Sequence, residues 1–125
     1  MITNTINWSV SSDSGSSPVT GSQGETGGTE IVINQQFAGA GSNVAYAVAF
    51  PMATIQSIIL VSNKNMTILV NSTTAPILTI NLVAGAPYVW DRSTGYFANP
   101  FTADVTTFYV SNTPAATLKG KVLKA

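Results

Sequence analysis

The chain of 125 residues contains no cysteine and no histidine. Without them it can hold no disulfide, no Ser-His-Asp or Cys-His nucleophilic site, no haem bound through His or Cys, no thiolate-bound iron–sulfur cluster and no zinc site built from these ligands. We therefore expect no cofactor and no metal. We also expect a stability that does not depend on the redox state of the surroundings.

Charge is the second scarcity. Charged residues make up 8% of the sequence and the net charge is zero, whereas about a quarter of an average globular protein is charged. A chain without a basic surplus lacks the electrostatic attraction on which binding to nucleic acids or anionic membranes depends. No apolar run approaches the roughly 18 residues that cross a bilayer. We expect neither nucleic acid nor membrane as a partner.

The few acidic residues form no catalytic pattern. They are Asp13, Glu25, Glu30, Asp91 and Asp104, and none lies in a pairing motif for glycoside hydrolysis. Calcium held by Asp91 and Asp104 is a lesser alternative, because no Asp-x-Asp loop is present. The Gly-rich segment lacks the lysine of a phosphate-binding loop. The sequence predicts a protein that is not an enzyme.

What the sequence does contain is a period of two. From Thr29 onward, short apolar runs recur with Gly, Pro and Asn turn residues between them, and no helical period is sustained. The predicted strands span residues 30–37, 43–50, 54–62, 66–71, 77–82, 88–90, 105–111 and 117–124. This pattern predicts an all-β domain over residues 29–125, a single antiparallel β-sandwich of jelly-roll or Greek-key type.

Residues 1–28 differ in composition from the rest. Ile6, Trp8 and Val10 alternate with polar residues, which predicts a short terminal strand that docks on the domain or on a neighbouring subunit. Residues 11–28 are rich in Ser, Gly and Thr, with Val19 as the only apolar side chain apart from Pro18. Such a segment cannot offset its ordering entropy by burial. We predict an extended Ser/Gly-rich N-terminal arm that carries a short terminal strand.

Two strand patterns point to contacts beyond a single sandwich. In residues 44–50 the large side chains point to one face and Ala45, Ala47 and Ala49 to the other, so the alanine face can accept another backbone closely. A loop of the same chain or a second subunit would cover it. Residues 58–61 and 66–70 are apolar on both faces, which is typical of strands covered on both sides by loops or by partners.

Residues 88–101 concentrate the aromatic side chains. Tyr, Trp and Arg are frequent anchors of protein interfaces, and exposed rings also stack on sugars. Three hypotheses stay open: the aromatics fold back over the end of the sandwich, they form a subunit contact, or Tyr88, Trp90 and Tyr96 bind glycans.

Charge order adds one more pattern. The first thirty residues hold three acids and no base, and the last strand holds Lys119, Lys121 and Lys124 with no acid. These lysines either protect an edge strand from aggregation or meet the arm of another copy in a salt-sensitive contact. The candidate interface residues are Trp8, Ala45, Ala47, Ala49, Tyr88, Trp90, Arg92, Tyr96, Phe97, Phe101, Lys119 and Lys121.

Several strings in the second half carry a resemblance. They are SIILVS at 57–62, AGAPYVW at 84–90, NPF at 99–101, ADV at 103–105, FYVSN at 108–112 and AATL at 115–118. Over about residues 54–123 the chain resembles small all-β virion structural proteins of tailed bacteriophages, of the head decoration or auxiliary capsid type.

The resemblance implies a non-enzymatic protein that is made in the host cytoplasm and resides on the virion. There it would bind and reinforce a protein lattice through subunit packing. Its implied partners are copies of itself, often as a trimer, and other virion proteins such as the major capsid protein. The alternative hypothesis is a fibre or tail-tip adhesin module that binds host surface glycans.

Overall fold

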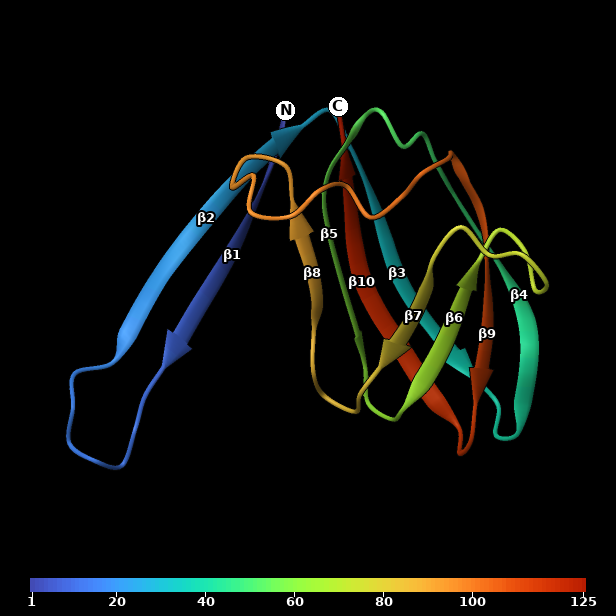
Figure 1. Ribbon diagram of the computed structural model, residues 1–125, viewed down its shortest axis with the longest axis horizontal. Coiled ribbons are helices and arrows are strands. Elements are labelled where there is room, and N and C mark those ends of the chain that lie inside the picture. The colour runs from blue at the N-terminus through green and yellow to red at the C-terminus, as the bar shows by residue number, and fades with distance from the viewer.

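The computed structural model describes residues 1–125 as ten strands without a helix (Figure 1). The strands are β1 (Ile2–Val10), β2 (Val19–Gly27), β3 (Thr29–Phe37), β4 (Gly41–Phe50), β5 (Ile55–Ser62), β6 (Met66–Val70), β7 (Thr79–Leu82), β8 (Tyr88–Asp91), β9 (Val105–Asn112) and β10 (Ala116–Lys124). The prediction of an all-β fold is confirmed, and β3 to β10 lie within two residues of their predicted ends. The structure contains no helix with the length and hydropathy of a membrane span.

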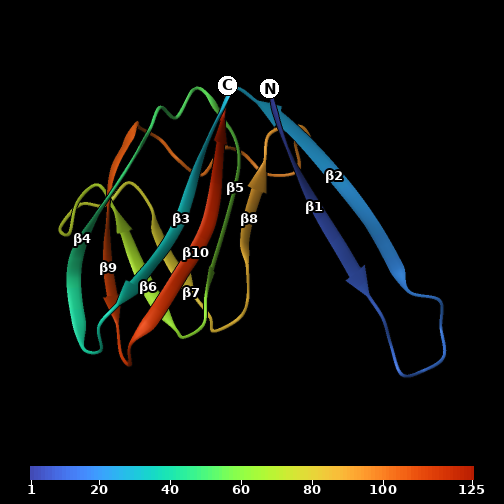
Figure 2. The same cartoon turned by 180° about the vertical axis from the view of Figure 1, so that it is seen from behind.

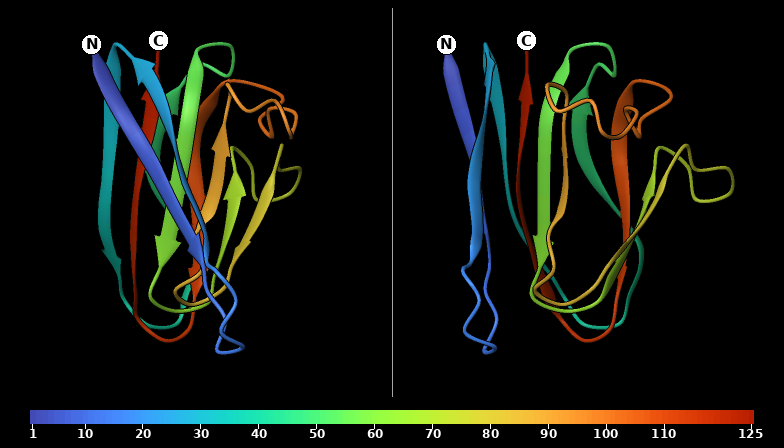
Figure 3. Two further views of the ribbon diagram at one scale, coloured as in Figure 1. Left: turned by 90° about the vertical axis from the view of Figure 1, so that its left-hand side faces the viewer. Right: turned by 60° about the vertical axis from the view of Figure 1, so that its left-hand side comes forward.

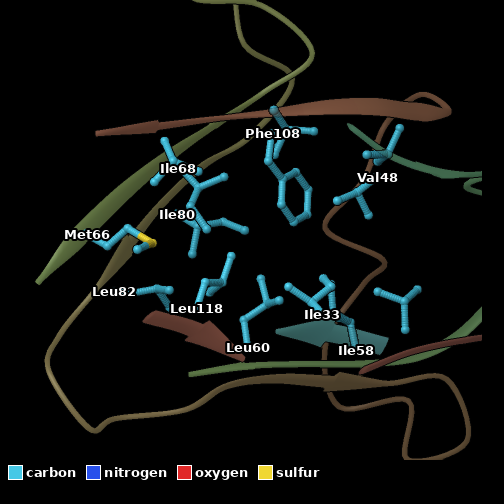
Figure 4. Close-up of a cluster of buried hydrophobic side chains, with 14 of the residues drawn as sticks. Ile33, Val48, Ile58, Leu60, Met66, Ile68, Ile80, Leu82, Phe108 and Leu118 are labelled. Carbon is cyan, nitrogen blue, oxygen red and sulfur yellow. The ribbon is translucent and has the colours of Figure 1, made fainter. Parts of the chain in front are cut away.

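Strands β3 to β10 build the sandwich. One sheet has the order β3-β10-β5-β8 and the other β4-β9-β6-β7, with every pairing antiparallel. Side chains from both inner faces meet in one cluster of 20 buried apolar residues (Figure 4). Leu60 and Leu118 approach it from the first sheet, and Ile68 and Phe108 from the second. Burying each such side chain contributes about 1.5–3 kcal/mol.

Strand β10 runs through the middle of its sheet, between β3 and β5. The hypothesis that Lys119 and Lys121 protect an edge strand is therefore wrong, although both are exposed. Halfway along β10, a Cβ on Gly120 would overlap the carbonyl oxygen of Ile59 on β5. Glycine at this position allows the two central strands to approach closely.

The N-terminal region is a hairpin. Strands β1 and β2 pair antiparallel from Ile2 opposite Gly27 to Val10 opposite Val19, with residues 11–18 as the loop (Figure 2). Within the predicted arm, residues 19–27 form a second strand, β2, which the sequence pattern did not predict. The ladder of backbone hydrogen bonds orders those residues, and this stabilisation cannot be inferred from their small, polar side chains. The predicted terminal strand is present, but its hydrogen-bonded partner is β2.

The hairpin is attached to the sandwich at one end. The backbone N–H of Gly28 donates to the carbonyl of Lys124 at 2.9 Å, and a Cβ on Gly27 would lie 2.6 Å from the same oxygen. From this root, the hairpin extends along the β3-β10-β5-β8 sheet and away from it (Figure 3). Its loop is the part farthest from its attachment (Figure 1).

Candidate functional site

The outer face of the β3-β10-β5-β8 sheet carries a row of three apolar residues and one lysine. Strand register places Val32, Lys121, Ile59 and Val89 side by side on four successive strands. Val32 is 63% exposed and Val89 39%, and Ile59 is half-buried. An antiparallel sheet normally presents polar residues to solvent. This face therefore presents more apolar surface than is usual for a sheet face that contacts only water.

A shallow depression lies in the middle of this face, around residues 119–121 of β10. It has a volume of about 380 Å³, and Val32, Ile59, Val61 and the two lysines Lys119 and Lys121 surround it. Lysine side chains cover apolar surface with their stems while their ammonium groups remain hydrated. The depression is thus an apolar contact surface with cationic edges.

The hairpin has an apolar face of its own. Strand register places Trp8 opposite Gly21 and Val10 opposite Val19 on the face that also carries Ile2 and Ile6. The other face carries only Ser, Thr, Asn and Gly. Ile2 and Ile6 are half-buried near the root, whereas Trp8 is 46% exposed, Val10 67% and Val19 65%. The apolar face is most exposed toward the loop.

A wedge-shaped opening separates these two surfaces. Residues 3–7 of β1 form one side of it, and Ser57, Ile59 and Lys121 belong to the other. The opening has a volume of about 410 Å³, and the views in Figure 3 place the hairpin beside the same sheet. We define this wedge, the depression beside it and the exposed part of the hairpin face as the candidate site.

The hairpin root is held by a clamp that the sequence did not predict. The Glu25 carboxylate accepts the backbone N–H of Ser93 at 2.7 Å and also the Ser93 hydroxyl. The amide of Gln23 donates to the Ser93 hydroxyl oxygen at 2.8 Å. Glu25 is buried here. No local pattern connects residues 68 positions apart, so only the folded chain reveals this contact.

The aromatic segment is divided between core and surface. Trp90 and Phe101 are buried: the indole N–H of Trp90 donates to the Phe97 carbonyl at 3.0 Å, and the Phe101 ring meets Phe50 edge-on at 5.1 Å. Their selection as interface residues is thus wrong, because folding has already removed them from any partner. The fold-back hypothesis holds for these two rings.

The remaining members of the segment differ in accessibility. Tyr88 is half-buried, and burial raises the pKa of its phenol above the ordinary value of 10.0. Arg92 is exposed, but its Nε donates to the Ile55 carbonyl at 2.8 Å and its Nη2 to the Ala53 carbonyl at 3.3 Å. Tyr96 and Phe97 are the two rings that stand in solvent, at 83% and 76% exposure.

The alanine face is open. Ala45, Ala47 and Ala49 are exposed on the outer side of β4, an edge strand of the second sheet, so the hypothesis that a loop of the same chain covers them is wrong. The register of β4 against β9 shifts twice. Such bulges make an edge a poorer template for further strand pairing. A partner would therefore contact the alanine face of β4 more readily than it would pair with the edge of this strand.

The charged residues mostly serve the chain itself. Lys121 pairs with Glu30 at 3.7 Å. Asp91 accepts the backbone N–H of Thr94 at 2.9 Å, and Asp104 that of Met52 at 3.0 Å, so both carboxylates fix loops. Lys119 lies on the outer face without an ion pair.

Comparisons of the chain with protein-family models, with curated proteins and with solved structures gave no match.

Proposed function

We propose that the chain is a non-enzymatic structural protein of a bacteriophage virion, of the head decoration or auxiliary capsid type. In this role it binds and reinforces a protein lattice through packing between subunits. Its partners are further copies of itself, as a trimer or another closed oligomer, and a lattice protein such as the major capsid protein.

The observation that carries the proposal is the apolar surface that one copy leaves open. The outer face of the β3-β10-β5-β8 sheet, the free half of the hairpin and the alanine face all meet solvent in the isolated chain. Exposed apolar patches of this kind mark sites of protein interaction. The scarcity of charge adds support, because surface without charges costs little to desolvate in an interface.

The proposal assigns the lattice contact to the face formed by Ala45, Ala47 and Ala49. Methyl groups on an edge strand allow another backbone to approach without the entropy loss of ordering long side chains. The exposed backbone beside them is bulged, so contact is through the face and does not require strand addition. This contact leaves the hairpin and the opposite sheet free for contacts between copies.

Binding to undecorated phage capsids tests the proposal. The purified chain should co-sediment with them in saturable, stoichiometric amounts and raise the temperature at which they disassemble. Ala47→Asp should weaken binding, because an unpaired carboxylate would be desolvated in the contact. Val83→Asp, at an exposed loop position, is the matched control. Absence of co-sedimentation at capsid saturation would overturn the proposal.

One observation favours a second candidate function, an adhesin module of a fibre or tail tip. Tyr96 and Phe97 expose adjacent rings in the loop after β8, and such rings stack on sugars. A glycan array would detect this activity. Tyr96→Ala should then abolish binding while Tyr109→Phe retains it; no glycan signal from the intact chain removes this candidate.

A further inference from the structure

We infer that the free half of the hairpin binds a second copy of this chain, on the outer face of its β3-β10-β5-β8 sheet. This exchange of hairpins rests on the proposed function, because it supplies the contact between copies that a reinforcing protein needs. It also names the two surfaces that meet.

The first argument is that the two surfaces match in chemistry. The hairpin offers Trp8, Val10 and Val19, whose exposed fractions rise toward the loop. The sheet offers Val32, Ile59 and Val61 around the depression over Gly120. Both surfaces are apolar, and Trp8, Val10, Val19 and Val32 are exposed in one copy.

The second argument is charge. Asp13, in the hairpin loop, is the one charged residue between the N-terminus and Glu25. On the sheet face Lys119 stands beside Val61 and Asn34, and neither Asp13 nor Lys119 has an ion pair in the single chain. A hairpin that lies across the sheet brings an unpaired acid toward an unpaired base.

The third argument is that the root clamp opposes closure onto the chain's own sheet. The bonds from Glu25 and Gln23 to Ser93 fix the hairpin at the β8 side. Gly28 is hydrogen-bonded to Lys124 at the chain's turn into β3. The free half would have to bend away from this root to reach the depression of its own copy. A second copy can reach it without any change at the root.

The fourth argument is size. The free part of the hairpin, residues 7–21, covers roughly 25 by 10 Å at ordinary strand dimensions. When two copies exchange hairpins, both sides of both contacts together bury about 1,000 Å², the area at which specific interfaces begin. A single, non-reciprocal contact would bury half of that. Reciprocal exchange is thus the arrangement that the area favours.

Because the chain has no cysteine, single introduced cysteines report the contact directly. Val10→Cys chains mixed with isotope-labelled Val61→Cys chains should form the mixed disulfide on mild oxidation. Ser9→Cys, one residue away on the polar face of the hairpin, is the matched control. The yield with Val10→Cys should exceed that with Ser9→Cys by about tenfold, because neighbouring side chains of a strand point to opposite faces and cysteines whose Cβ atoms point apart cannot be bridged without backbone movement.

Two results would overturn the inference. One is an equal yield from the Val10→Cys and Ser9→Cys mixtures. The other is an intramolecular disulfide in the double variant carrying Val10→Cys and Val61→Cys, which would show that the hairpin closes onto its own sheet. Capsid binding is scored separately. Mixed disulfides without capsid binding would support the hairpin exchange and contradict the proposed function. Capsid binding by chains that form no mixed disulfide would support the proposed function and contradict the hairpin exchange.

Discussion

The hairpin and the sandwich are both antiparallel β structure, but different interactions hold them. In the sandwich, two sheets bury 20 apolar side chains against each other. In the hairpin, two strands with polar side chains on one face rely on their backbone ladder and on a few contacts at the root. A lone two-stranded hairpin is at best marginally stable in water. The sandwich provides stability, and the hairpin extends surface into solvent.

The two tryptophans allow this difference to be measured. Trp8 lies in the hairpin, half-exposed over Gly21, and Trp90 lies in the sandwich core. In a Trp8→Phe background, fluorescence reports the sandwich alone. In a Trp90→Phe background it reports the hairpin. We expect the hairpin signal to change at a lower urea concentration than the sandwich signal.

The largest expected effect comes from the core. Phe108 is fully buried between the sheets, and Phe108→Ala should lower the free energy of unfolding by about 3–5 kcal/mol through lost burial and a cavity. Urea denaturation followed by Trp90 fluorescence measures this loss. Val83→Ala, at an exposed position, should change it little. Similar losses for both variants would contradict the sandwich as the stabilising region.

The second effect should be confined to the hairpin. Glu25→Ala removes the acceptor for Ser93, and a hydrogen bond to a charged group contributes about 1.5–3 kcal/mol. Hydrogen exchange in β1 and β2 should accelerate accordingly, while exchange in β5, β9 and β10 stays unchanged. Thr26→Ala, its exposed neighbour, is the control. Unchanged exchange in β1 and β2 would mean that the clamp does not hold the root.

The third effect compares the same substitution in the two regions. Gly120→Ala places a Cβ against the Ile59 carbonyl, and overpacking of this kind costs about 1–3 kcal/mol. Gly24→Ala in β2 meets only the Thr3 methyl at 3.8 Å and should stabilise the hairpin by up to about 1 kcal/mol. Denaturation read at Trp90 and at Trp8 measures the two changes. A tolerated Gly120→Ala would contradict the close approach of β10 and β5.

The smallest effect concerns pH. Burial raises the pKa of Tyr88 above its ordinary value of 10.0, so the folded chain holds this proton more tightly than the unfolded chain. The contribution of this protonation to the free energy of unfolding is complete below pH 10.0 and is lost as the pH rises through the raised pKa. Tyr88→Phe should flatten the fall of the urea midpoint above that pH. Tyr96→Phe, at an exposed ring, should leave the fall unchanged.

The fold was predictable from the sequence where side chains alternate. Val48 and Phe50 point inward and the alanines outward, as the period of two in this segment requires. Strand order was not predictable, because alternation says nothing about neighbours; an edge position was one of two hypotheses for the lysines of β10, and this strand lies in the middle of its sheet. Strand β2 was missed because its order comes from backbone hydrogen bonds that leave no mark on composition.

The candidate site was predictable only in part. Trp8, Lys119 and Lys121 were selected from the sequence and lie on the surfaces around the wedge. Trp90 and Phe101 were selected for the same aromatic character and are buried. An aromatic residue is common both in cores and at interfaces, so its type does not say where it lies. Only the folded path of the chain around β8 shows which of these aromatic residues are buried. Val32 was missed, and residues 58–61 were recognised as apolar on both faces without their neighbours, because only strand register brings Val32 and Val61 beside the two lysines.

The attachment of the hairpin at one end has a mechanical consequence. A force applied to the loop of residues 11–18 acts through the whole length of β1 and β2 before it reaches the clamp at Glu25 and the Gly28–Lys124 bond. These few bonds would break well before two sheets could be separated. Strain on the loop would therefore detach the hairpin root while the sandwich stays folded, and the root could bind again once the strain is released.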